Sequence, residues 1–173
     1  MYIKFAGCLL LIGGTTLAGF RKAEELKERV EKLEMLKRMM VMMQGEFRFR
    51  HATLSEVLEN VSGKMSQPFG NIFGRIAKQL EERNHEGFQK IWEDGTLALL
   101  QCGGIQTSEQ RIFELLGNGL GYLDLETQID TLQLAVLQME EKIEEAKEQR
   151  DREGKLYRTM GMTLGALFVL LVV

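Results

Sequence analysis

Residues 125–146, LETQIDTLQLAVLQMEEKIEEA, decide the fold class, because their apolar side chains alternate steps of four and three residues over three heptads. This spacing predicts a coiled-coil seam along one long helix. The seam residues are Leu125, Ile129, Leu132, Val136, Met139, Ile143 and Ala146. Only Gly154 interrupts the helical pattern between the seam and the apolar end of the chain.

Apolar periodicity predicts five further helices, and the 173 residues contain a single proline. The first runs from about Ala23 to Met43, and the second starts at a Thr53–Glu56 capping box and ends before Pro68. The third helix has the apolar set Phe69, Ile72, Phe73, Ile76 and Leu80. The fourth has Phe88, Ile91, Trp92 and Leu99 and ends at Gly103-Gly104. The fifth starts near Thr107, with Gln110 as the second residue of a capping box, and has the apolar set Ile112, Phe113 and Leu116. We therefore predict an all-α six-helix bundle whose first and last helices pair antiparallel as a stalk.

The two ends are the only strongly apolar stretches, Phe5–Phe20 and Thr159–Val173. Sixteen helical residues measure roughly 24 Å against a hydrocarbon core of ~30 Å, so the first can span a bilayer, and the fifteen-residue second spans with less margin. Arg21 and Lys22 follow the first stretch directly, which favours an uncleaved anchor over a cleaved signal peptide. We predict transmembrane segments at 1–20 and 159–173 on either side of a helical domain at 21–158.

The distribution of basic residues predicts the orientation, because cytoplasmic flanks of membrane spans are enriched in Lys and Arg. Ten lie at the inner ends of the two stretches: Arg21, Lys22, Lys27, Arg29, Lys32, Lys147, Arg150, Arg152, Lys155 and Arg158. The outer sides offer only Lys4 and the terminal amine. The domain is therefore expected in the cytoplasm with both termini outside.

Composition argues against several kinds of function. The net charge of −3 disfavours a nucleic-acid partner, and His51 and His85 lack neighbours at metal-ligand spacing. No serine lies in an elbow motif, so we expect no catalytic residues, no cofactor and no metal. An enzyme acting on lipid or nucleotide at the membrane surface is the least favoured function.

Two short motifs invite a binding interpretation that their context does not support. Gly117-Asn118-Gly119-Leu120-Gly121 lacks the spacing and the preceding strand of a phosphate loop, which favours a flexible interhelical turn. Arg48-Phe49-Arg50-His51 interleaves basic and aromatic residues on an acidic chain, which favours a helix-to-helix connection over RNA binding.

Three features suggest interaction surfaces. Small residues recur four apart at Gly14 and Ala18 and at Gly161 and Gly165, a spacing that permits close packing of membrane helices, although glycine is common there anyway. Trp92 and the acidic run are candidate partner surfaces; the run comprises Glu140, Glu141, Glu144, Glu145 and Glu148. The methionine cluster, Met39, Met40, Met42 and Met43, could form an adaptable partner surface, but core filling is favoured.

The order and spacing of these elements resemble the stage III sporulation protein AB family of endospore-forming bacteria over essentially the whole chain. The resemblance is carried by Gly19-Phe20, the Arg29 to Leu36 helix, Glu46, Thr53-Leu54, Trp92-Glu93, Leu120-Gly121, Asp124, Gln128, Tyr157 and Gly161. It implies a membrane component of a channel-like complex between mother cell and forespore. It also implies a cytosolic domain similar to that of the type II secretion and type IV pilus platform protein.

The resemblance further implies partners: the membrane bilayer, a cytosolic secretion-type ATPase (stage III sporulation protein AA) and other membrane subunits. It transfers no catalytic residues. The secretion platform usually repeats the domain, so self-association is a further expectation. We predict a non-enzymatic scaffold in the mother-cell-derived membrane, and the alternative is a membrane-tethered coiled-coil adaptor or signalling protein.

Overall fold

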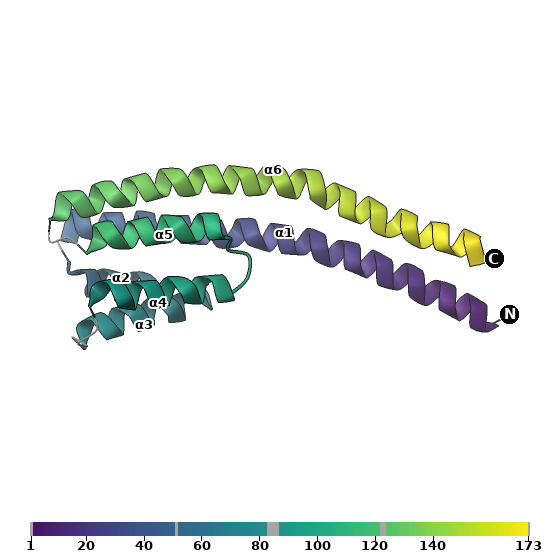
Figure 1. Cartoon of the computed structure of the whole chain (residues 1–173), viewed down its shortest axis with the longest axis horizontal. Helices are drawn as coiled ribbons and strands as arrows, with labels where there is room; N and C mark the ends of the chain where they lie inside the picture. Colours follow the sequence, from purple (N-terminus) through teal and green to yellow (C-terminus); the bar gives the residue numbers. More distant parts are fainter. Residues whose placement is uncertain (1, 51, 83–86, 122–123, 173) are drawn as a thin grey trace. The chain divides into compact units, whose positions relative to one another are not determined.

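The computed structural model describes residues 2–50, 52–82, 87–121 and 124–172, and side chains from Gly13 to Thr163 with further gaps at 158 and 161–162. The described residues form six helices and no strand: α1 (Tyr2–Arg50), α2 (Leu54–Ser62), α3 (Phe69–Glu81), α4 (Phe88–Gln101), α5 (Thr107–Leu120) and α6 (Leu125–Val172) (Figure 1). The predicted all-α class and the number of helices are confirmed.

The chain divides into two compact units. The central unit is Lys32–Ile143, and the terminal unit combines Met1–Glu31 with Glu144–Val173. α1 and α6 contribute to both units, whereas α2 to α5 lie entirely in the central one.

The core of the central unit is built on the predicted apolar stripes. On α1, Leu33, Leu36, Met39, Met40 and Met43 are fully buried, so core filling is confirmed for three of the four clustered methionines, while Met42 is half-buried. On α6, the seam residues Leu132, Met139 and Ile143 are buried, while Leu125, Ile129 and Val136 are half-buried. Gln44 on α1 donates from Nε2 to the Ile129 carbonyl oxygen on α6 at 3.4 Å, which fixes the register of the two antiparallel helices.

Helices α2 to α5 complete this core. The rings of Phe73 on α3 and Phe113 on α5 lie 6.2 Å apart, and both side chains are buried. Gly103 and Gly104 take positive φ angles of 70° and 79° after α4, as expected of glycines that end a helix. The Gln67–Pro68 peptide bond before α3 is cis.

Three local predictions were wrong. Residues 117–120 belong to α5 and Gly121 has a φ of −72°, so this glycine-rich segment is helix rather than a turn. Arg48, Phe49 and Arg50 form the last turn of α1 rather than a connection, and His51 lies outside the described residues. The box at the start of α5 pairs the Gln106 N–H with the Glu109 carboxylate, one residue earlier than expected.

In the terminal unit, α1 and α6 pack through a short apolar stripe. Ala23, Leu26 and Val30 on α1 are buried, as is Ala146 on α6, and Arg29 donates to Gln149 Oε1 at 3.5 Å. Most of the predicted spans lie outside the residues whose side chains are described. Within the described part of the chain, no helix has a segment both long and apolar enough to cross a bilayer.

Candidate functional site

Trp92 anchors the contact between α4 and α5. Its side chain is 1% exposed, and its Nε1–H donates to the Phe113 carbonyl oxygen at 2.7 Å. The Phe88 ring lies 5.8 Å away on the same helix. The Trp92 side chain itself cannot contact a partner, because its ring is enclosed by the core and its polar atom is already bonded; a partner role for the surrounding part of the domain stays a prediction.

The helical glycines explain how the indole fits. A Cβ on Gly117 would lie 2.2 Å from Trp92 Cδ1, and a Cβ on Gly119 would lie 2.2 Å from Thr131 Oγ1 on α6. The missing side chains thus let α5 approach α4 on one face and α6 on another. The glycine-rich segment serves close helix packing rather than ligand binding.

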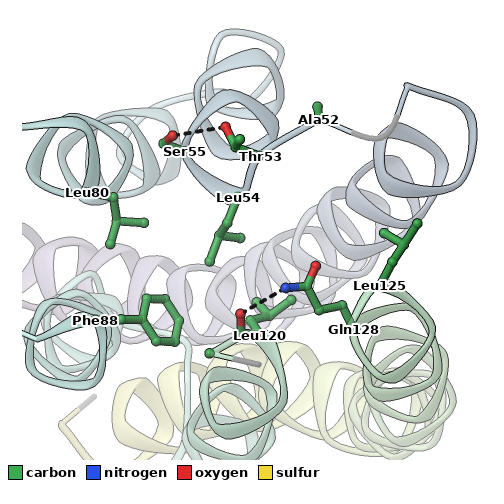
Figure 2. Close-up of a pocket in the computed structure, with 10 residues that line it drawn as sticks. Ala52, Thr53, Leu54, Ser55, Leu80, Phe88, Leu120, Leu125 and Gln128 are labelled. Carbon is green, nitrogen blue, oxygen red and sulfur yellow. Dashed lines mark hydrogen bonds between the residues drawn. The ribbon is translucent and has the colours of Figure 1, made fainter. Parts of the chain in front are cut away.

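An open cleft of about 500 Å³ lies next to this contact (Figure 2). Leu54, Leu80 and Phe88 point into the same space. The lining comes from the start of α2, α4 and α6 and the end of α3 and α5: Ala52, Thr53, Leu54, Ser55, Leu80, Phe88, Leu120, Gly121, Leu125 and Gln128. Gln128 donates from Nε2 to the Leu120 carbonyl oxygen at 3.2 Å, which ties α6 to the end of α5.

The described lining of the cleft is mostly apolar, with a few neutral polar side chains. Its described polar side chains are the hydroxyls of Thr53 and Ser55, whose oxygens lie 3.2 Å apart, and the amide of Gln128. Among the described lining residues there is no carboxylate, imidazole, thiol or amine. The described part of the cleft can therefore accept an apolar group beside a few neutral hydrogen-bonding groups.

Two capped helix starts frame the cleft. The Thr53 N–H donates to Glu56 Oε2 at 2.9 Å, and this bond is the main reason that the pKa of Glu56 lies below its ordinary value. Asp124 Oδ2 accepts from Thr127 Oγ1 at 2.6 Å and from the Thr127 N–H at 3.0 Å, which lowers the pKa of Asp124. Both carboxylates sit at helix N-termini, where negative charge is favoured.

These caps should make folding weakly acid-sensitive. A carboxyl group whose pKa is lower in the folded than in the unfolded state stabilises the fold above its unfolded pKa of about 4, and this contribution is lost as the pH falls through the folded pKa. We expect Glu56→Gln with Asp124→Asn to flatten the fall of the thermal midpoint between about pH 5 and pH 3, measured by circular dichroism. Glu59→Gln, at an exposed position within α2, is the control, and an unchanged acid slope in the double variant would contradict the prediction.

The other predicted site residues lie on the long helices. All five glutamates of the acidic run are exposed; Glu140 and Glu141 belong to the central unit and the other three to the terminal unit. Glu140 pairs with Lys37 Nζ at 3.3 Å, and Glu144 with Lys147 Nζ at 3.1 Å. A partner role for the run stays a prediction.

The small-residue spacings are placed only in part. Gly14 and Ala18 are exposed on α1, and a Cβ at Gly14 would meet no atom of the described residues within 4 Å. Gly161 and Gly165 lie in α6, but their surroundings fall outside what the structure describes. Intramembrane packing through these residues stays a prediction. No group of His, Cys, Asp and Glu among the described residues is arranged to hold a metal ion.

Sequence reasoning missed Thr131, Glu109 and the cleft itself. Thr131 was overlooked because the seam pattern concerns only apolar positions. Glu109 has 0% exposure and its box partner Gln106 is not one of the usual capping residues, so the pattern pointed to Thr107 instead. The cleft has no local signal, since five helix ends distant in sequence combine to line it.

The fold and the cleft define an all-helical protein with an open, mostly apolar cleft where the ends of its helices meet. The chain belongs to the stage III sporulation protein AB family, since residues 4–173 match the family model described as Stage III sporulation protein AB (spore_III_AB). The predicted family is thereby confirmed.

Two relatives agree with this assignment. Stage III sporulation protein AB of Bacillus subtilis (strain 168) is 22% identical over 170 residues, which cover 98% of this chain and 99% of that protein. A solved structure of stage III sporulation protein AB (SpoIIIAB) has a TM-score of 0.65 and 19% identity, and covers 72% of this chain and 98% of its own. The structural likeness confirms the fold.

Proposed function

We propose that this chain is a non-enzymatic scaffold in a sporulation-specific, secretion-like complex, held in the mother-cell-derived membrane. The observation that carries the proposal is the family match over residues 4–173, nearly the whole chain. The described residues are compatible with binding of a partner, because the described lining of their cleft is mostly apolar and can accept an apolar group.

The membrane part of the proposal rests on the sequence. The apolar stretches Phe5–Phe20 and Thr159–Val173 close the two ends of the chain, and the basic residues gather on their inner sides. We propose that both stretches cross the membrane, with the helical domain in the cytoplasm and both termini outside. By resemblance to secretion platform proteins, that domain would present itself to a cytosolic ATPase and to other membrane subunits.

The test is a clean deletion in the native host, complemented by the wild-type gene and scored by microscopy for growth, engulfment and mature spores. We expect normal growth and a developmental arrest around the completion of engulfment. The complementing copy, tagged internally, should sediment with membranes and copurify with the ATPase. Normal spores in the deletion strain would overturn the sporulation role, and copurification with a kinase or soluble regulator instead would favour the adaptor alternative.

The proposed ATPase surface can be probed within the same strain. Charge reversal at Glu145 and Glu148 changes two exposed members of the acidic run in the terminal unit. Glu59→Lys on α2 is the matched control, because Glu59 is exposed and lies outside the run. Equal ATPase recovery from both variants would remove the acidic run as the contact surface.

A further inference from the structure

The outward face of the α1–α6 pair in the central unit exposes three large aliphatic side chains. Val41 on α1 is 48% exposed, and Leu134 and Leu137 on α6 are each 56% exposed. Leu134 and Leu137 lie on the side of α6 opposite to the buried Leu132 and Met139. Three exposed aliphatic side chains on neighbouring helices of a packed unit form a candidate contact surface for another protein.

Opposite charges surround these residues on the two helices. The α1 segment 32–50 has five basic and two acidic residues, a net charge of +3, and the α6 segment 125–143 has four acidic and one basic, a net charge of −3. Arg38 and Arg48 lie one and two turns from Val41, and Asp130 and Glu141 lie one turn from Leu134 and Leu137. Within the described residues, Arg48, Asp130 and Glu141 are exposed and form no ion pair.

The register between the helices is fixed by two contacts. Lys37 Nζ lies 3.3 Å from Glu140 Oε1, and Gln44 Nε2 lies 3.4 Å from the Ile129 carbonyl oxygen. Interpolating between these contacts along antiparallel helices places Val41 level with Leu134. Extrapolated from the Gln44 contact at equal rise per residue, Arg48 is level with Leu125, roughly 7.5 Å along the axis from Asp130, and Arg38 is level with Leu137 or Gln138, about one turn from Glu141.

We infer that this face binds a second copy of the chain about a two-fold axis parallel to the helices. Such an axis sets α1 of each copy against α6 of the other, antiparallel and at an unchanged level. Val41 then meets Leu134 and Leu137 of the second copy, Arg48 extends toward Asp130, and Arg38 extends toward Glu141. The two paired layers form a four-helix arrangement with an apolar centre and oppositely charged rims.

A second copy fits this face better than an unrelated partner does. The face is basic on one helix and acidic on the other, so a uniformly acidic or basic partner would match half of it and be repelled by the rest. A two-fold copy of the same face is complementary to both halves at once. This inference uses only the central unit and does not depend on the proposed function.

The first test measures the mass of the full-length chain, dispersed in mild detergent, by light scattering over a range of concentrations. We expect a dimer, and expect Arg48→Glu or Leu134→Asp to raise its dissociation constant at least about tenfold. Adding Asp130→Arg to Arg48→Glu should restore most of the affinity, because it exchanges the two charges of the proposed pair. Circular dichroism checks that each variant keeps its helical content.

The second test detects the contact directly. With Cys8 and Cys102 replaced by serine, a Val41→Cys chain mixed with a differently tagged Leu134→Cys chain should form a mixed disulfide on mild oxidation. Leu97→Cys mixed with Leu115→Cys is the matched control, because these leucines are 50% and 56% exposed but lie on α4 and α5. A chain that stays monomeric up to about 100 µM would overturn the inference. So would a dimer that forms the control disulfide equally well and whose affinity is not restored when Asp130→Arg is added to Arg48→Glu.

Discussion

Trp92→Ala is expected to lower the free energy of unfolding by about 4 kcal/mol, the largest effect of any single substitution considered for this chain. The indole is 1% exposed and fills the space between α4 and α5. Its removal leaves a cavity and also deprives the Phe113 carbonyl oxygen of a 2.7 Å hydrogen bond. Urea unfolding of the full chain, followed by far-UV circular dichroism, gives the free energy; fluorescence is unsuitable because Trp92 is the only tryptophan.

Trp92→Phe separates the two contributions. Phenylalanine retains most of the buried apolar area but cannot donate the hydrogen bond, so we expect a loss of about 1 to 2 kcal/mol. A loss below about 1 kcal/mol for Trp92→Ala would show that the α4–α5 contact contributes little to folding and would contradict the packing described above.

Gly117→Ala is expected to destabilise the chain by about 2 kcal/mol, although alanine is the better helix former. The new Cβ would lie 2.2 Å from Cδ1 and 2.4 Å from Nε1 of Trp92. These atoms belong to a rigid ring held by a hydrogen bond, so the helices must separate or the ring must move. The measurement is the midpoint of urea unfolding, with Trp92 fluorescence reporting the surroundings of the indole.

Two comparisons make this prediction specific. Gly45→Ala is the control, because Gly45 lies within α1 and a Cβ there meets no atom within 4 Å; it should stabilise the chain by up to about 1 kcal/mol. In a Trp92→Ala background the clash disappears, so Gly117→Ala should become nearly neutral, giving a coupling of about 2 kcal/mol. A destabilisation by Gly117→Ala that persists without the indole would refute the steric explanation.

The helices themselves were predictable because their determinants are local. On α1, apolar residues recur every three or four positions at Leu33, Leu36, Met40 and Met43. This spacing places them on one face of the helix, and that face is buried. Gly103 and Gly104 marked the end of α4 from sequence, since they supply the positive φ that ends a helix. Local patterns of this kind survive folding whenever tertiary packing agrees with them.

The errors fall where local signals were ambiguous. Gly117 and Gly119 suit a turn and a close-packed helix equally well, and only the presence of Trp92 and Thr131 across the interface selects the helix. The basic, exposed residues Arg48 to Arg50 suggested a connection from the sequence. They instead continue α1, because the preceding Phe47 is buried in the core with 1% exposure. Trp92 was correctly placed in the apolar set of its helix, but the sequence did not show that its indole is enclosed by the core and so cannot contact a partner.

The sequence by itself determined the all-helical class, the family, the apolar ends and the core stripes of α1 and α6, because periodicity, composition and motif order are properties of the chain. Tertiary structure alone decided three things: which glycines lie under neighbouring side chains, where Trp92 points, and which helix ends meet around the cleft of Figure 2. The physical reason is that these features depend on distances between residues far apart in the chain. Those distances are fixed only when whole helices pack against one another.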